Sequence, residues 1–152
     1  MLESIAMKPF GSRVPLNILC AALLLAAPSV FAGELLVVAG ANSGLPVLDK
    51  SQVRNIFLGK ASSLPDGRTA VPVDQPESSP LRDEFYVKVT SHSAAEVKAR
   101  WAQMAFTGRG EPPRVGKNSS DIKKILNSTP GAVGYIEKSE LDASVMVLLT
   151  VE

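Results

Sequence analysis

The stretch that decides the fold lies between Val71 and Phe85 and reads VPVDQPESSPLRDEF. Its β-branched start favours a short strand, and the prolines and serines that follow favour a loop. Ser79 is a good N-cap, and Pro80 suits the first helical position because the N–H that proline lacks has no intrahelical partner there. The stretch therefore predicts a strand that passes through a short loop directly into a helix.

This junction is a candidate anion site. A helix N-terminus offers free N–H groups and a partial positive charge, and Ser78 and Ser79 add two hydroxyls. Arg82 lies one turn inside the helix, where its guanidinium could face a bound anion. The alternative is that Ser79 only caps its own helix and that Arg82 is a solvated surface charge. The candidate ligand-binding residues, including one from the loop described below, are Ser78, Ser79, Leu81, Arg82 and Arg109.

Apolar patterning elsewhere predicts strands that alternate with helices. The run from Leu35 to Ala39 is continuously apolar and suits a strand buried on both faces, as in a parallel sheet. Asp49 or Ser51 can cap a short helix, and Ser93–Glu96 forms a capping box for a longer one. Three more elements are predicted: a helix capped by Ser119 or Ser120, and strands at Gly131–Ile136 and Val145–Val151. The alternation predicts the α/β class, with a mainly parallel or mixed sheet flanked by helices.

Between Thr107 and Asn118 the chain is irregular and basic, with Arg109 and Arg114 among glycines and prolines. These arginines could close over an anion, since a guanidinium binds phosphate or sulfate through paired N–H groups. The alternative is a mobile basic loop balanced by neighbours such as Glu111. The sequence favours that alternative unless folding brings Arg109 beside Ser78.

Residues 1–32 are predicted to be a signal peptide, and residues 33–152 the mature domain. Lys8 and Arg13 precede an apolar stretch, and small residues allow cleavage after Ala32. The stretch is too short to span a membrane, so a secreted, periplasmic protein without a membrane span is expected. Met7 is a plausible alternative start. Cys20 lies inside the apolar run rather than after it, which argues against a lipoprotein.

The mature composition excludes several classes of function. Without residues 1–32 the chain has no cysteine and one histidine, so disulfides, thiol catalysis and multi-histidine metal sites are not expected. Removing Lys8, Arg13 and Glu3 lowers the 16 basic and 15 acidic residues to 14 of each. A net charge of zero argues against nucleic acid as a partner. No cofactor is expected.

An enzyme is not expected either. A hydrolase would pair Ser78 or Ser79 with His92 and an acid such as Asp74, and the chain has no Gly-x-Ser-x-Gly motif. His92 follows the serines by about three helical turns, or roughly 16–20 Å, which is far outside hydrogen-bond reach.

Three segments, in order, resemble the phosphate-binding periplasmic proteins of ABC transporters, within the type II periplasmic binding superfamily. They are Leu48–Gly59 (LDKSQVRNIFLG), the strand with its serine-bearing helix start, and Thr129–Tyr135 (TPGAVGY). The resemblance covers roughly residues 35–136. It implies the fold of one lobe of such a protein, and a small phosphate-like oxyanion held at Ser78 and Ser79.

Two departures from that family leave two hypotheses open. Asp74 stands where the family places an arginine, and a carboxylate repels phosphate; Ser79-Pro80 replaces a Gly-Thr pair. The chain also resembles one lobe where family members close two lobes on the ligand. Either a second chain supplies the other wall and the domain binds a solute, or it is an interaction module of the cell envelope with a decayed ligand site.

Overall fold

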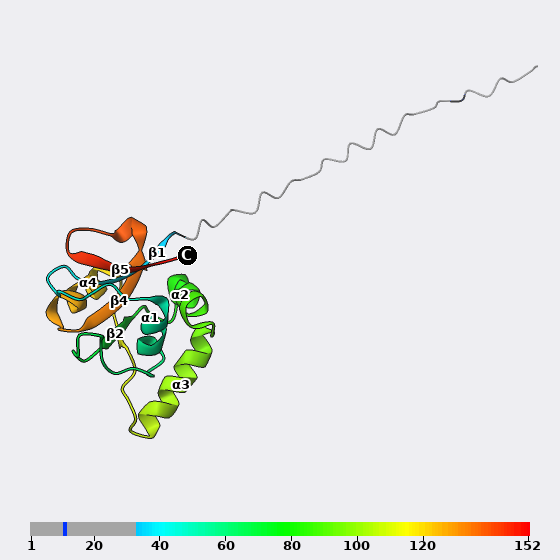
Figure 1. The fold of residues 1–152 in the computed structure, drawn as a ribbon. Helices are drawn as coiled ribbons and strands as arrows, with labels where there is room; N and C mark the ends of the chain where they lie inside the picture. Colours follow the sequence, from blue (N-terminus) through cyan, green and yellow to red (C-terminus); the bar gives the residue numbers. More distant parts are fainter. Residues whose placement is uncertain (1–10, 12–32) are drawn as a thin grey trace, which may run out of the picture. The chain divides into compact units, whose positions relative to one another are not determined.

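The computed structural model describes Gly11 and residues 33–152. The predicted signal peptide, its cleavage after Ala32, the alternative start at Met7 and Cys20 lie outside the described residues. The elements, shown in Figure 1, are β1 (Leu35–Gly40), α1 (Lys50–Phe57), β2 (Val71–Asp74), α2 (Pro80–Thr90), α3 (Ala94–Phe106), β3 (Arg114–Val115), α4 (Ser119–Ser128), β4 (Ala132–Glu137), the 3₁₀ helix η1 (Lys138–Glu140) and β5 (Val145–Val151).

The described strands form one mixed sheet in the order β3-β2-β4-β1-β5, and the predicted α/β class is confirmed. β2 runs parallel to β3 and β4, whereas β1 runs antiparallel to β4 and β5. β1 is buried along its whole length, as its apolar run predicted, but it has no parallel neighbour. A continuously apolar strand indicates that both of its faces are covered by helices. It does not indicate whether the strand pairs parallel or antiparallel with its neighbours.

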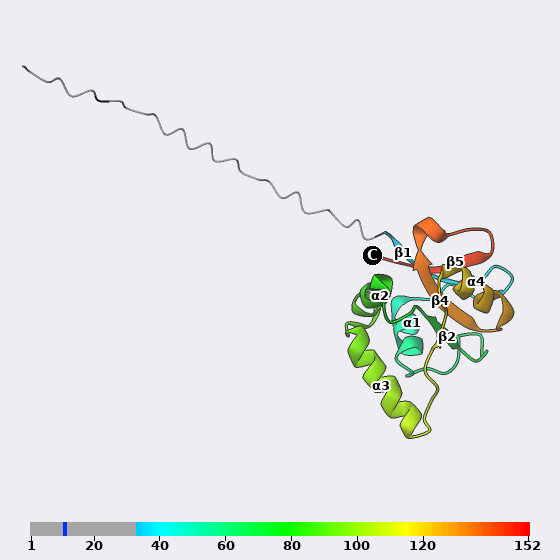
Figure 2. The same ribbon diagram turned by 180° about the vertical axis from the view of Figure 1, so that it is seen from behind.

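Helices cover both faces of the sheet (Figures 1 and 2). Alternate residues of β1 point to opposite sides: Leu35 and Val37 pack in the cluster that includes α1, α2 and α3, and Leu36 and Val38 pack in the cluster that includes α4. The strand therefore has no solvent-facing side, which explains why it reads as continuously apolar.

The helix starts were predicted from local signals and are largely correct. Asp49 and Ser93 each form a complete capping box at α1 and α3. The prediction for α4 is wrong, because its cap is Asn118, whose side chain accepts from the Asp121 N–H. Ser119, which was predicted as a cap, is the first helical residue.

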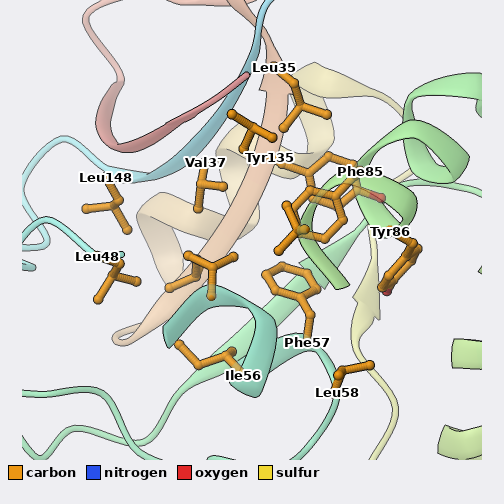
Figure 3. Packing of buried hydrophobic residues seen from close by; sticks show 14 of the residues in the cluster. Leu35, Val37, Leu48, Ile56, Phe57, Leu58, Phe85, Tyr86, Tyr135 and Leu148 are labelled. Atoms are coloured by element: carbon orange, nitrogen blue, oxygen red, sulfur yellow. The ribbon is translucent and has the colours of Figure 1, made fainter. Parts of the chain in front are cut away.

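Four aromatic rings from α1, α2 and β4 meet in the hydrophobic cluster that includes α1, α2 and α3 (Figure 3). The rings of Phe85 and Tyr135 stack with centroids 3.9 Å apart, and Phe57 meets Phe85 edge-on at 4.7 Å. Tyr86 contacts Phe85 edge-on as well. This packing fixes the two tyrosine rings, and hence where their hydroxyls point.

Candidate functional site

Asp74, at the carboxyl end of β2, is the centre of the candidate site. It is only 4% exposed. Its Oδ2 accepts hydrogen bonds from Arg82 Nε at 3.1 Å and from the Tyr86 hydroxyl at 2.7 Å. Its Oδ1 accepts from the Gln75 N–H at 2.8 Å and from the Tyr135 hydroxyl. We call these five residues the Asp74 cluster; its four donors satisfy both carboxylate oxygens.

Local structure explains how these donors converge. Arg82 and Tyr86 are four residues apart in α2, so their side chains share one face of the helix. Tyr135 comes from β4, the parallel neighbour of β2. The Gln75 side chain donates to the Tyr135 carbonyl at 3.0 Å and ties the end of β2 to β4.

The cluster is electrostatically self-contained. Burial acts to lower the pKa of Arg82, but the charge and hydrogen bond of Asp74 raise that pKa by more. Burial, followed by the neighbouring Asp74, raises the pKa of Tyr86 and of Tyr135 far above the ordinary phenol value. Both hydroxyls are therefore proton donors at any physiological pH.

The helix start that was predicted to hold an anion has few free N–H groups. Ser79 and Pro80 occupy the N-cap and first helical positions as predicted, but the Ser79 side chain makes no capping bond. The Ser79 N–H donates to Pro76 O, the Arg82 N–H donates to Ser79 O, and Pro80 has no N–H. Within residues 33–152, the N–H groups of Ser78 and Leu81 donate to no acceptor and are left for an external one.

The predicted site residues are only partly brought together. Ser78 is exposed and Ser79 partly exposed at the start of α2. Arg82 is 9% exposed and bonded to Asp74, so its interpretation as a solvated surface charge is wrong. Arg109 lines a separate cavity of about 330 Å³ with Trp101 and Met104, and it is absent from the lining of the cavity beside Asp74.

A cavity of about 260 Å³ opens beside the Asp74 cluster. Its walls come from the end of β2, from α2 and α3, and from the segment that leads into β3. We call it the α2–α3 cavity, and the residues that line it are Asp74, Gln75, Glu77, Arg82, Tyr86, Lys98, Trp101, Ala102, Pro112, Pro113 and Val115. Most of its exposed lining is apolar, and Arg82 is the one buried cation among the lining residues.

The side chains and helices in the described part of the chain bear on metal binding and on membrane spanning. There, no group of three or more His, Cys, Asp or Glu side chains is placed to hold a metal ion. No helix among the residues placed by the structure has the length and apolar character that crossing a bilayer requires.

The sequence analysis missed the roles of Tyr86 and Tyr135. The chain has two tyrosines in all, and both donate to Asp74. The four-residue spacing of Arg82 and Tyr86 was a local signal that could have found one of them. Tyr135 lies 61 positions from Asp74, and only the pairing of β2 with β4 brings it there.

Comparisons with known proteins support the fold. No model of a protein family matches the sequence, and neither does any curated protein. Among solved structures, the chain is similar to a Clostridium perfringens protein assigned as a phosphate ABC transporter substrate-binding protein and crystallised with bound phosphate. The TM-score is 0.61 and the identity 22%, over 76% of this chain and 44% of that one.

Two other solved structures are similar to the chain over the same share of its length. An ABC-type phosphate transport receptor from Vibrio cholerae matches with a TM-score of 0.59 and 19% identity, over 76% of this chain and 45% of that one. PstS from Borrelia burgdorferi matches with a TM-score of 0.56 and 12% identity, over 76% and 46%. The chain thus spans less than half the length of these proteins, and its described part has the fold of that portion of a phosphate ABC transporter substrate-binding protein.

Proposed function

We propose that this chain is a secreted, non-enzymatic interaction module of the cell envelope, with a solute-binding fold whose anion seat is filled by its own Asp74 carboxylate. One observation carries the proposal: Asp74 takes the hydrogen bonds of Arg82, Tyr86, Tyr135 and the Gln75 N–H, at the strand end where an external oxyanion would need them.

The balance of charge supports this proposal. An incoming phosphate would meet a buried carboxylate of the same sign, and in a low-dielectric site like charges repel strongly. The nearest buried cation, Arg82, is already paired with that carboxylate. Two of the amides at the helix start donate to nearby carbonyls, and Pro80 supplies none.

A second candidate function is capture of a small phosphate-like oxyanion at Ser78, Ser79 and the Leu81 N–H. It is favoured by the Ser79 side chain, which makes no capping bond, and by the exposure of Ser78. The bound phosphate of the Clostridium perfringens structure supports the same reading by analogy of fold.

Calorimetry and thermal unfolding of the secreted chain with phosphate, sulfate and molybdate separate the two candidates. We expect no saturable heat and no rise in Tm, because the donors at the strand end are occupied. Specific binding at a hundred times Kd would stabilise the fold by about 2.7 kcal/mol. Such a rise, if abolished by Ser78→Ala with Ser79→Ala and kept by Ser91→Ala, would establish the oxyanion candidate instead.

Expression of the whole chain in a Gram-negative host tests the secretion part of the proposal. We expect a periplasmic product whose mass corresponds to residues 33–152, because Ala32 ends the predicted signal peptide. Replacing Ala32 with arginine should block processing, since the cleavage site requires a small residue there. If the unaltered chain stays in the cytoplasm of the host without being processed, the proposal that it is secreted is contradicted.

A further inference from the structure

We propose that the α2–α3 cavity binds a small apolar carboxylic acid, with its carboxylate on Arg82 and its apolar body against Trp101, Pro112 and Val115. This site is distinct from the serine-bearing helix start, but it uses Arg82 of the Asp74 cluster. An oxyanion at the strand end would compete with Asp74 for donors that Asp74 already engages, whereas this ligand takes the two terminal nitrogens of Arg82 that Asp74 leaves free.

The guanidinium of Arg82 has donors that the Asp74 cluster does not use. The Arg82 side chain is 10% exposed, and it donates to Asp74 through Nε alone. Within residues 33–152 its two terminal nitrogens make no hydrogen bond, although Arg82 lines the cavity. Neither nitrogen is among the fully buried polar atoms, so their N–H groups are open to water or to an acceptor from a ligand in the cavity.

The guanidinium is also held in a fixed orientation. Its Nε is tied to Asp74, and its central carbon lies 5.3 Å from the centre of the Tyr86 ring, where the ring's π-face attracts a cation. With Nε engaged, the edge formed by the two terminal nitrogens remains for a second partner. A carboxylate matches that edge with two parallel, charge-assisted hydrogen bonds.

The exposed lining of the cavity is mostly apolar and favours a ligand with an apolar body. Trp101 is 7% exposed and is held by its indole N–H, which donates to Phe57 O at 2.8 Å. Pro112, Pro113 and the exposed Val115 add further apolar lining. Lys98 and Glu77 pair with each other at 2.7 Å through exposed side chains, so the rim adds no strong net charge.

The volume of the cavity limits the size of the ligand. The cavity measures about 260 Å³. A cavity of about 150 Å³ accommodates benzene, and drug-sized ligands occupy roughly 300–1,000 Å³. A single aromatic ring with a short carboxylate arm, such as phenylacetate, therefore fits. For a ligand this small we expect a Kd of about 1 mM.

Trp101 is the single tryptophan of the chain and lines both this cavity and the cavity that contains Arg109, so its fluorescence detects a bound ligand and the variants described below assign it to one cavity. The experiment titrates the secreted chain with phenylacetate and with phenylacetamide, which has the same body without the charge. We expect a saturable change with the acid and at least about tenfold weaker binding of the amide, because charge-assisted hydrogen bonds are roughly twice as strong as neutral ones.

Three variants, one of them a control, locate the site. Ala102→Phe fills the cavity from an exposed position of α3, and Ala99→Phe is the matched control on the same helix outside the lining. Arg82→Lys keeps a cation for Asp74 but loses the paired terminal donors. We expect Ala102→Phe to abolish binding, Ala99→Phe to leave it unchanged, and Arg82→Lys to weaken it at least about tenfold.

Three results would overturn the proposal: no saturable change with phenylacetate at about ten times the expected Kd, equal binding of acid and amide, or unchanged binding in Ala102→Phe. Circular dichroism of each variant shows whether its fold is kept. If Arg82→Lys fails to fold, the comparison of the two alanine positions and of the two ligands still decides the outcome.

Discussion

Replacing Asp74 with alanine is expected to destabilise the fold by about 3–5 kcal/mol. The substitution leaves the buried Arg82 guanidinium without its counter-ion and removes the acceptor of two buried tyrosine hydroxyls. Domains of this size are stable by only about 5–15 kcal/mol, so the loss is a large share of the total. Urea unfolding followed by Trp101 fluorescence and by circular dichroism measures it.

Asp83→Ala is the matched control for that experiment. Asp83 is an exposed acid in the first turn of α2, and its favourable interaction with the helix dipole contributes roughly 0.3–1 kcal/mol. The double variant Asp74→Ala with Arg82→Met removes both charges, so we expect it to be more stable than Asp74→Ala alone. A loss for Asp74→Ala as small as that for Asp83→Ala would show that the carboxylate is not committed to the cluster, and the proposed function would lose its support.

Local signals made the order of elements predictable. The junction from Val71 to Phe85 folds as its residues indicate: Pro80 is the first residue of α2, and Phe85 lies on the buried face of that helix. Capping boxes also fix the starts of α1 and α3, because they depend on residues within one turn of each other. Such features require no knowledge of distant parts of the chain.

The site was much less predictable, since it depends on contacts between distant segments. An arginine three residues after a serine cap resembles a surface charge, and only the carboxylate of Asp74, eight positions earlier, turns Arg82 inward. The hydroxyl of Tyr135 reaches Asp74 from 61 positions away. The sequence did indicate that Asp74 stands in place of a cation, but not that donors surround it.

The two tyrosines are expected to remain protonated in alkali until the protein unfolds. Burial and the neighbouring Asp74 raise the pKa of Tyr86 and of Tyr135 above the ordinary phenol pKa of about 10. Below that pH both states hold the phenol protons and the stabilisation is complete. Above it the unfolded chain releases two protons that the folded chain keeps, so stability falls by about 2.7 kcal/mol per pH unit.

Tyrosinate absorbance and Trp101 fluorescence, recorded against pH on one sample, test this directly. Because the chain has two tyrosines and both belong to the Asp74 cluster, the absorbance reports on no other site. We expect both signals to change together in one transition above pH 10, whereas in concentrated urea the tyrosines should titrate near about 10. Tyrosinate formed at that pH while Trp101 stays in its native environment would mean that at least one hydroxyl does not donate to Asp74. Since Asp74→Ala examines the acceptor and this titration examines the donors, agreement between the two would assign the strand end to an internal carboxylate by independent routes.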